Sequence, residues 1–442
     1  MHNRKLIYIK SNATILLAFI LFLITGNLAT AQDNSISLEK SKAAALEYSN
    51  NIKNGNLKIE EAELIKKEAA SHYLPTVSAV GAGIYGFDDI IGAIPPYLTE
   101  GISNMYLAGV SATEVIYAGG KINNSNKLAQ LQIEVNKIRA GQAQDSVLLL
   151  TEQKYWKLVQ VQEQQKVLLS NEKYLDELLK QQQDLLDEGL IARNQLLRVK
   201  VERSKLLLQK SRLENARKIV LLDFSLYTGI PYDTTLLAID TFNTIAAPEL
   251  KYVQADSGLE NNSNYQLLEK SMEASKLQTA ITKGGLMPTI SIGLGANQFG
   301  TFDGVVDGQF LPVAFGTISI PISDWWGAKK QKVNQKEIHE KITVNEFKDG
   351  EDKLRLAITK SWYDLSDAYK QIEFAQENID LAEENLRVSR DNYNSGLSSL
   401  SDLLDAQRLY QQAETELVTA YANYEDKEVV YLYRTNQLSN QD

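Results

Sequence analysis

Residues able to do chemistry are few in this chain, and their spacing limits what that chemistry can be. The sequence has no cysteine, and after His2 its histidines are His72 and His339, far apart from each other. It therefore offers no thiol and no histidine-rich metal site, and it contains no nucleophile elbow, phosphate loop or dinucleotide fingerprint. We expect no enzyme activity, no cofactor and no metal centre.

Two carboxylates are notable for their spacing. Asp402 and Asp405 are three residues apart in a helical pattern, so both side chains lie on one face of the helix. Acidic residues are also favoured near a helix N-terminus, which gives this pair a purely structural alternative. Whether this pair has a functional role or only a structural one depends on the elements that surround it.

The N-terminal segment is typical of a secretory signal peptide. Arg4, Lys5 and Lys10 precede an apolar run at 14–24, and Ala29-Thr30-Ala31 forms a small-residue cleavage site, so we assign residues 1–31 to the signal. A membrane anchor is the alternative, but the apolar run is short for a span.

The charge balance narrows the range of partners. The full sequence has a net charge of −10. An acidic chain is a poor ligand for nucleic acid, whose phosphates need clustered lysine and arginine. Without cysteine, neither disulfides nor an acylated cysteine after the signal is expected.

The chain repeats its plan after about 210 residues. Leu74-Pro75-Thr76-Val77 returns as Met287-Pro288-Thr289-Ile290, and Gly189-Leu190 returns as Gly396-Leu397. A period this long is not that of a solenoid. We interpret it as the duplication of a domain that contains a first helix, a strand pair, and two long helices meeting at a Gly-Leu turn.

The helical stretches are unusually long. No proline occurs from Gly120 to Gly189, and a second such stretch covers 328–396. A helix of about 70 residues spans about 100 Å. Apolar residues keep a seven-residue step, as in Ile358, Leu365, Ile372, Ile379, Leu386 and Tyr393. This step is typical of coiled-coil pairing, either in a solid rod or in the wall of a water-filled tube.

Between the helices the pattern changes to a period of two, which predicts strands. In the second copy Ile290, Ile292 and Leu294 alternate with small or polar residues. The first copy is less regular: we expect Val80, Ala82 and Ile84 on one face against Ser78, Gly81 and Gly83 on the other.

Aromatic residues gather near the ends of these segments, as in ordinary sheet packing or in the girdle of a membrane barrel. A sheet in lipid must close, because open edges leave backbone groups unsatisfied. Four strands cannot close alone, two chains would give a filled eight-stranded barrel, and three chains would give twelve strands with a lumen.

The sequence resembles the TolC family of outer-membrane efflux proteins over about residues 36–435. The resemblance is carried by the Leu-Pro strand entry, by Ile116-Tyr117-Ala118-Gly119-Gly120-Lys121, and above all by Tyr393-Asn394-Ser395-Gly396-Leu397 followed by Asp402-Leu403-Leu404-Asp405-Ala406. It implies a mainly α fold with a small β part, internally duplicated. Very long coiled-coil helices would form a periplasmic α-barrel, and four strands per chain would contribute to a trimeric 12-stranded transmembrane β-barrel.

The resemblance also implies a function. The chain would be the exit duct of a tripartite efflux pump or type I secretion system in the outer membrane of a Gram-negative bacterium. Its partners would be two further copies of itself, a periplasmic adaptor (membrane fusion) protein, an inner-membrane RND or ABC transporter, and outer-membrane lipid. The alternative is a periplasmic coiled-coil adaptor or scaffold without a barrel.

Site residues are carried over by position. Asp402 and Asp405 match the acids of the pore constriction, and Tyr393 with Gln195 matches the contacts that gate the aperture. The hairpin tips that dock to the adaptor fall at Gly189, Leu190, Gly396 and Leu397. The charged partners of the family's latch are replaced by Gln195 and Ser398, so closure would depend on neutral hydrogen bonds and packing.

These expectations define the domain plan. It comprises the signal peptide (1–31), the first helix, strands and long hairpin of repeat 1 (32–73, 74–117 and 118–228), an equatorial segment between repeats (229–257), the first helix, strands and long hairpin of repeat 2 (258–286, 287–324 and 325–433), and a short tail (434–442).

Overall fold

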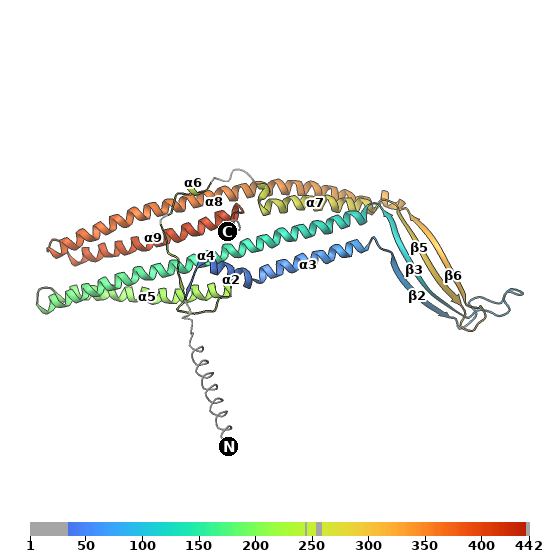
Figure 1. The fold of residues 1–442 in the computed structure, drawn as a ribbon, viewed down its shortest axis with the longest axis horizontal. Helices are drawn as coiled ribbons and strands as arrows, with labels where there is room; N and C mark the ends of the chain where they lie inside the picture. Colours follow the sequence, from blue (N-terminus) through green and yellow to red (C-terminus); the bar gives the residue numbers. More distant parts are fainter. Residues whose placement is uncertain (1–33, 244, 253–258, 439–442) are drawn as a thin grey trace, which may run out of the picture. The chain divides into compact units, whose positions relative to one another are not determined.

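The computed structural model describes residues 34–243, 245–252 and 259–438. The predicted signal peptide lies outside these residues. The described chain is mainly helical with a small sheet part, as the sequence predicts. The first repeat contains, in order, β1 (Ser35–Ile36), α2 (Leu38–Tyr48), α3 (Asn50–Ser71), β2 (Thr76–Tyr85), β3 (Asn104–Ala118), α4 (Lys121–Asp187) and α5 (Arg193–Thr228) (Figure 1).

The second repeat follows a connecting segment. That segment contains β4 (Leu237–Ala238), α6 (Pro248–Lys251) and the 3-10 helix η1 (Leu259–Asn261). The repeat itself contains α7 (Ser263–Gly284), β5 (Thr289–Gly300), β6 (Gln309–Ser319), the 3-10 helix η2 (Ile322–Trp325), α8 (Ala328–Asn394) and α9 (Leu400–Arg434).

Three pairs of corresponding helices in the two repeats have nearly equal lengths. Helices α3 and α7 each have 22 residues, α4 and α8 each have 67, and α5 and α9 have 36 and 35. The two uninterrupted 67-residue helices arise because neither stretch contains a proline to remove a backbone donor. Among the described residues, no helix is both long and apolar enough to cross a membrane.

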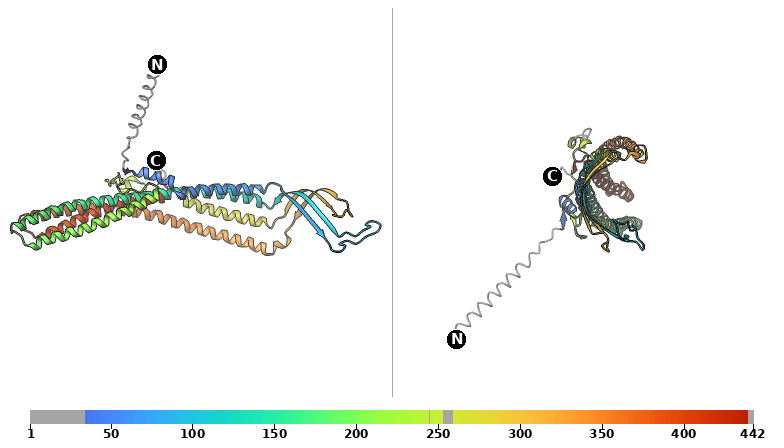
Figure 2. Two further views of the ribbon diagram at one scale, coloured as in Figure 1. Left: turned by 90° about the horizontal axis from the view of Figure 1, so that it is seen from below. Right: turned by 90° about the vertical axis from the view of Figure 1, so that its right-hand side faces the viewer.

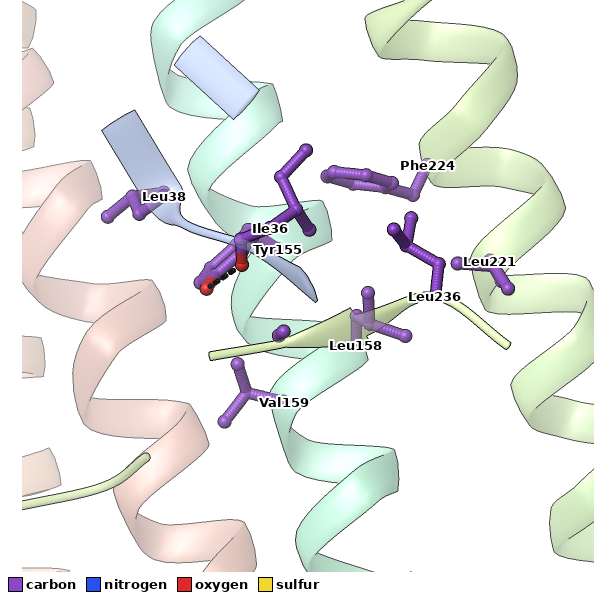
Figure 3. Packing of buried hydrophobic residues seen from close by; sticks show 9 residues of the cluster. Ile36, Leu38, Tyr155, Leu158, Val159, Leu221, Phe224 and Leu236 are labelled. Atoms are coloured by element: carbon purple, nitrogen blue, oxygen red, sulfur yellow. Dashed lines mark hydrogen bonds between the residues drawn. The ribbon is translucent and has the colours of Figure 1, made fainter. Parts of the chain in front are cut away.

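The chain divides into two compact units, with boundaries inside α4 and α8. The first unit contains α2, α5, most of α9, and the parts of α4 and α8 at 148–187 and 365–394. One core cluster of this unit is built around Tyr155, which is fully buried. The Tyr155 hydroxyl lies 3.0 Å from the carbonyl oxygen of Ile36 (Figure 3). It also lies 2.5 Å from the carboxylate of Asp240. Strand β1 is thereby attached to α4, next to its parallel partner β4.

The second unit contains α3, α7, the other parts of α4 and α8, and the sheet. Its strands are antiparallel in the order β2-β3-β5-β6, so the two repeats meet at the β3–β5 pair. The strands leave the helix ends as a twisted ribbon (Figure 2). Polar side chains link the helices: Asn136 Nδ2 donates to the carbonyl oxygen of Lys58 at 2.8 Å, and Lys270 pairs with Glu134 at 2.7 Å.

Two details differ from the sequence expectations. The segment at 32–73 forms two helices instead of one, because the chain bends at Ser49, whose N–H donates to the Ala45 carbonyl at the end of α2. In β2, Ser78 lies on the same face as Val80, Ala82 and Ile84, since side chains two residues apart share a face. The predicted opposition between Ser78 and those apolar residues is therefore wrong.

Candidate aperture at the hairpin tips

Each long hairpin turns at a glycine in the left-handed region. Gly189 has a φ of 75° and Gly396 a φ of 74°, values that glycine adopts without steric cost. In each turn the glycine N–H donates three residues back and the following leucine N–H five residues back, the pattern of a Schellman motif. Leu190 and Leu397 remain 67% and 79% exposed.

The carboxylate of Asp402 caps helix α9. Its Oδ2 accepts hydrogen bonds from the N–H and the hydroxyl of Ser399 at 2.9 and 2.8 Å, and the Asp402 N–H donates back to Ser399 Oγ at 3.3 Å. This reciprocal pair is a capping box. The hydrogen bonds from Ser399 lower the pKa of Asp402 below its usual range, so the exposed carboxylate is ionised at neutral pH.

Asp405 lies one turn further along α9 and has a counterion in the same helix. Arg408 Nη2 lies 3.4 Å from Asp405 Oδ1, and both side chains are mostly exposed. The helix face that carries Asp402 and Asp405 therefore also carries a positive charge. An exposed pair at this spacing contributes little stability, but Arg408 offsets part of the local negative potential.

Within the single chain, the hydroxyl of Tyr393 contacts Gln182. The contact with Gln195 that the resemblance implies stays a prediction for the assembled channel. Gln182 Nε2 donates to Tyr393 Oη at 2.9 Å, and Tyr393 Oη lies 3.2 Å from Gln182 Oε1. Gln182 is fully buried in α4, whereas Gln195, in the first turn of α5, is only half-buried. The contact joins the end of α8 in one repeat to α4 in the other.

The seam between the repeats continues as a polar ladder away from the tips. Gln407 Nε2 donates to Asn171 Oδ1 at 3.0 Å, and Asn171 Nδ2 donates to Gln411. Around these polar groups lies an apolar cluster of Leu168, Leu175, Leu178, Val199, Leu206, Leu386, Leu400, Leu403 and Ala406. Polar groups inside an apolar seam favour one register of the paired helices.

Several residues that form contacts in this region were not predicted from the sequence. Ser399 could have been found, because Ser-x-x-Asp before an apolar run is a capping signature. Gln182 also carried a signal, since it follows Leu168 and Leu175 at the seven-residue step. Arg198, which donates to Ser401 in the next repeat, carried none.

Among the described residues, no cluster of three or more histidine, cysteine or acidic side chains is placed to hold a metal ion. What the tips offer is an exposed carboxylate face on α9, a buried neutral seam, and two exposed leucines at rigid turns. Such a surface can attract cations and contact a partner.

Comparisons with known proteins bear on the fold of the chain. Residues 255–430 match the family model described as outer membrane efflux protein. The chain is 16% identical to the CmeC outer membrane channel of Campylobacter jejuni, with a TM-score of 0.78 over 92% of this chain and 86% of that one. It is 12% identical to the outer membrane protein VceC of Vibrio cholerae, with a TM-score of 0.76 over 90% and 95%.

A third solved structure also has a similar fold. The open-state MtrE outer membrane channel of Neisseria gonorrhoeae is 15% identical, with a TM-score of 0.71 over 90% of this chain and 88% of that one. No curated protein matches the sequence. The chain thus has the fold of outer-membrane channels, and its second repeat matches the outer membrane efflux protein family. The resemblance seen in the sequence is confirmed.

Proposed function

We propose that this protein is the outer-membrane exit duct of a tripartite efflux pump or type I secretion system. The proposal rests on the open edges and the exposed apolar side chains of the sheet in the single chain. β2 is exposed along its whole length, and Val77, Leu294 and Ile318 are each about two-thirds exposed. Among the described residues, β2 and β6 each pair with one strand only, so both sheet edges are open. A four-stranded sheet with open edges and exposed apolar residues needs further strands and an apolar surrounding.

Three copies of the chain would supply the further strands, and the lipid of the outer membrane would supply the apolar surrounding. Joining β6 of one copy to β2 of the next closes a barrel of twelve strands, with no edge left in the lipid. Two copies would give eight strands, whose interior fills with side chains. A lumen therefore favours the trimer.

The helices would extend this lumen into the periplasm. Helices α4, α5, α8 and α9 of three copies would surround a water-filled tunnel, and the Gly-Leu tips at 189–190 and 396–397 would contact the adaptor. Cargo would pass without chemical change, because selection and energy come from the inner-membrane transporter. The seven-residue step supports helix pairing, and the polar outer faces support a wet surface.

The candidate constriction has a role in this assembly. Three-fold symmetry would convert Asp402 and Asp405 into two stacked rings of three carboxylates, which attract cations and repel anions. Arg408 would reduce this field, so we propose moderate cation selectivity. The contact between Tyr393 and Gln182 would hold the second-repeat hairpin against the first in the narrow state.

The second candidate, a periplasmic adaptor or scaffold, has less support. Long hairpins fit it equally well, but it gives no reason for two amphipathic strand pairs with open edges. Cell fractionation separates the two: the duct predicts trimers in the outer membrane that dissociate on heating in detergent. A monomer released with the soluble periplasmic fraction would contradict the duct.

A further inference from the structure

Charge is unevenly distributed where the strands of the second unit meet its helices. The four junctions cover residues 64–75, 119–128, 277–288 and 320–337. They contain nine lysines and three acidic residues, although acidic residues outnumber basic ones in the rest of the chain. Because the sheet is antiparallel, all four junctions lie at the same end of it.

The second repeat contributes most of these charges. Its junction lysines are Lys283 at the end of α7 and Lys329, Lys330, Lys332 and Lys336 in the first turns of α8. The first repeat adds Lys66 and Lys67 from α3 and Lys121 and Lys127 from α4. Together these nine are called the junction lysines below.

Few of the junction lysines are neutralised. Within the part of the chain that the structure describes, the ion-paired ones are Lys283, 2.8 Å from Glu337, and Lys329, 2.6 Å from Asp324. Lys332 and Lys336 donate to neutral glutamine oxygens. The pKa of Glu337 is lowered, first by the hydrogen bond from Lys283 and further by Lys330 and Lys341, as expected in a positive field.

Aromatic side chains separate the apolar strands from the junction lysines. Trp325 and Trp326 follow β6 and are 48% and 69% exposed. Tyr73, just before β2, and Tyr117, near the end of β3, are 48% and 45% exposed. Trp325 Nε1 donates to the carbonyl oxygen of Leu286 at 2.8 Å, which ties η2 to the end of α7. Apolar strand, exposed aromatic and then lysine is the order expected across a membrane interface.

We propose that the junction lysines form a binding surface for anionic phospholipid headgroups of the periplasmic leaflet of the outer membrane. The inference rests on the proposed function, since it requires the sheet to lie in lipid. The chemistry recognised is the phosphate diester of a headgroup with net negative charge. An ammonium group on a flexible stem can reach such a headgroup as a point charge.

The distances along the helices fit this surface. Lys332 lies four residues from the start of α8, or about 6 Å at 1.5 Å per residue. The polar layer on each side of a bilayer is about 5–8 Å thick, so Lys329, Lys330 and Lys332 fall at headgroup level. Lys336 lies about 12 Å from the helix start and reaches back along the helix surface.

The test measures which lipids surround the protein. The full chain is reconstituted into phosphatidylcholine vesicles that contain spin-labelled phosphatidylglycerol or spin-labelled phosphatidylcholine, and the motionally restricted fraction of each label gives their relative association. We expect about a fivefold preference for phosphatidylglycerol, the ratio that one lysine near an anionic surface provides. The preference should approach one at 1 M salt because the charges are screened.

Three variants locate the surface. Substitution of Lys329, Lys330, Lys332 and Lys336 by glutamine should reduce the preference at least twofold, whereas substitution of the same four by arginine should retain it. The matched control carries the same glutamine substitution at Lys348, Lys353, Lys360 and Lys370, which lie further along α8. It should leave the preference unchanged.

The outcomes distinguish this inference from the proposed function. No preference in the unmodified protein, or an equal loss in the control variant, would overturn the lipid surface while the duct stands. A protein that restricts no lipid label in any vesicle would overturn the duct itself. If the glutamine variant does not assemble, two results still decide whether the junction lysines bind anionic headgroups: the salt dependence of the unmodified protein and the preference of the arginine variant.

Discussion

The hydroxyl of Tyr393 lies 2.9 Å from the amide nitrogen of Gln182, across the seam between the two repeats. Both residues belong to seven-residue series, so both face the partner helix. The contact is neutral, and one of its members is fully buried. A buried neutral hydrogen bond responds little to salt, unlike the family's charged latch, whose charged partners are replaced in this chain by Gln195 and Ser398.

The first prediction concerns this contact. Tyr393→Phe keeps the ring in the seam but leaves the buried amide of Gln182 without its partner, which costs about 1–3 kcal/mol. If the contact holds the tunnel narrow, the open probability in planar bilayers should rise about tenfold, since 1.4 kcal/mol corresponds to that factor. Changing the salt concentration should not reproduce the effect.

Gln195 provides the matched control. It is the partner expected from the resemblance, whereas in the single chain the Tyr393 hydroxyl is hydrogen-bonded to Gln182. Gln195→Ala should therefore leave the open probability within twofold of the unmodified protein. An equal rise in both variants would mean that Tyr393 meets Gln195 in the assembled channel and that the seam contact is secondary.

The second prediction separates the two roles of Asp402. Asp402→Ala combined with Asp405→Ala should bring the cation-to-anion permeability ratio close to one. Ser399→Ala removes the capping hydrogen bond but no charge, so it should destabilise the start of α9 by about 1 kcal/mol and keep the selectivity. The reversal potential in a salt gradient measures the ratio. Loss of selectivity in Ser399→Ala alone would show that helix capping, not ring charge, governs the aperture.

The third prediction is a variant that should raise the cation-to-anion permeability ratio instead of lowering it. Arg408→Gln removes the positive charge 3.4 Å from Asp405 and should raise the cation-to-anion permeability ratio. Arg387→Gln is a control on α8, where Arg387 pairs with Glu384 at 2.7 Å. It should change the ratio less, because Arg387 lies outside the proposed constriction. A fall in the ratio with Arg408→Gln would contradict the account.

The fourth prediction concerns pH and Glu425 in α9. Burial, with added repulsion from Glu428 and Glu152, raises the pKa of Glu425 to about 8, while Lys251 opposes the shift. Glu428 and Glu152 are themselves paired, with Lys251 at 2.8 Å and Lys42 at 2.7 Å. The folded chain therefore holds a proton that the unfolded chain releases at lower pH, so unfolding free energy is greatest below about pH 4.5 and falls toward pH 8.

Glu425→Gln should remove this dependence. Relative to the unmodified protein it should gain roughly 1–3 kcal/mol at pH 8 and much less at pH 5. Hydrogen exchange of the α9 amides at the two pH values measures the difference. An equal effect at pH 5 and at pH 8 would mean that the carboxyl is ionised at both, which contradicts the raised pKa.

Much of the fold could be predicted because long-range periodicity was strong. Proline-free stretches and a seven-residue step indicated helices that the structure shows as 67 residues each, and the Leu-Pro and Met-Pro entries located β2 and β5 within a residue or two. The break at Ser49 and the short β1–β4 pair escaped prediction. Both depend on tertiary contacts, such as that between Tyr155 and Ile36, which no local pattern encodes.

The aperture region was only partly predictable. The turns at Gly189 and Gly396 followed from glycine's tolerance of positive φ. The partner of Tyr393 could not be predicted in this way, because the relative register of α4 and α8 is set by packing along the whole seam. The roles of Asp402, Asp405 and the tips as constriction and docking surfaces stay predictions for the assembled channel.

Single-channel recording of the purified protein in planar bilayers tests whether its copies form a channel. We expect discrete conductance steps with a cation-selective reversal potential, and a loss of that selectivity in the Asp402→Ala, Asp405→Ala double variant. A protein that stays folded as a monomer in water without detergent, and adds no conductance to the bilayer, would contradict channel formation.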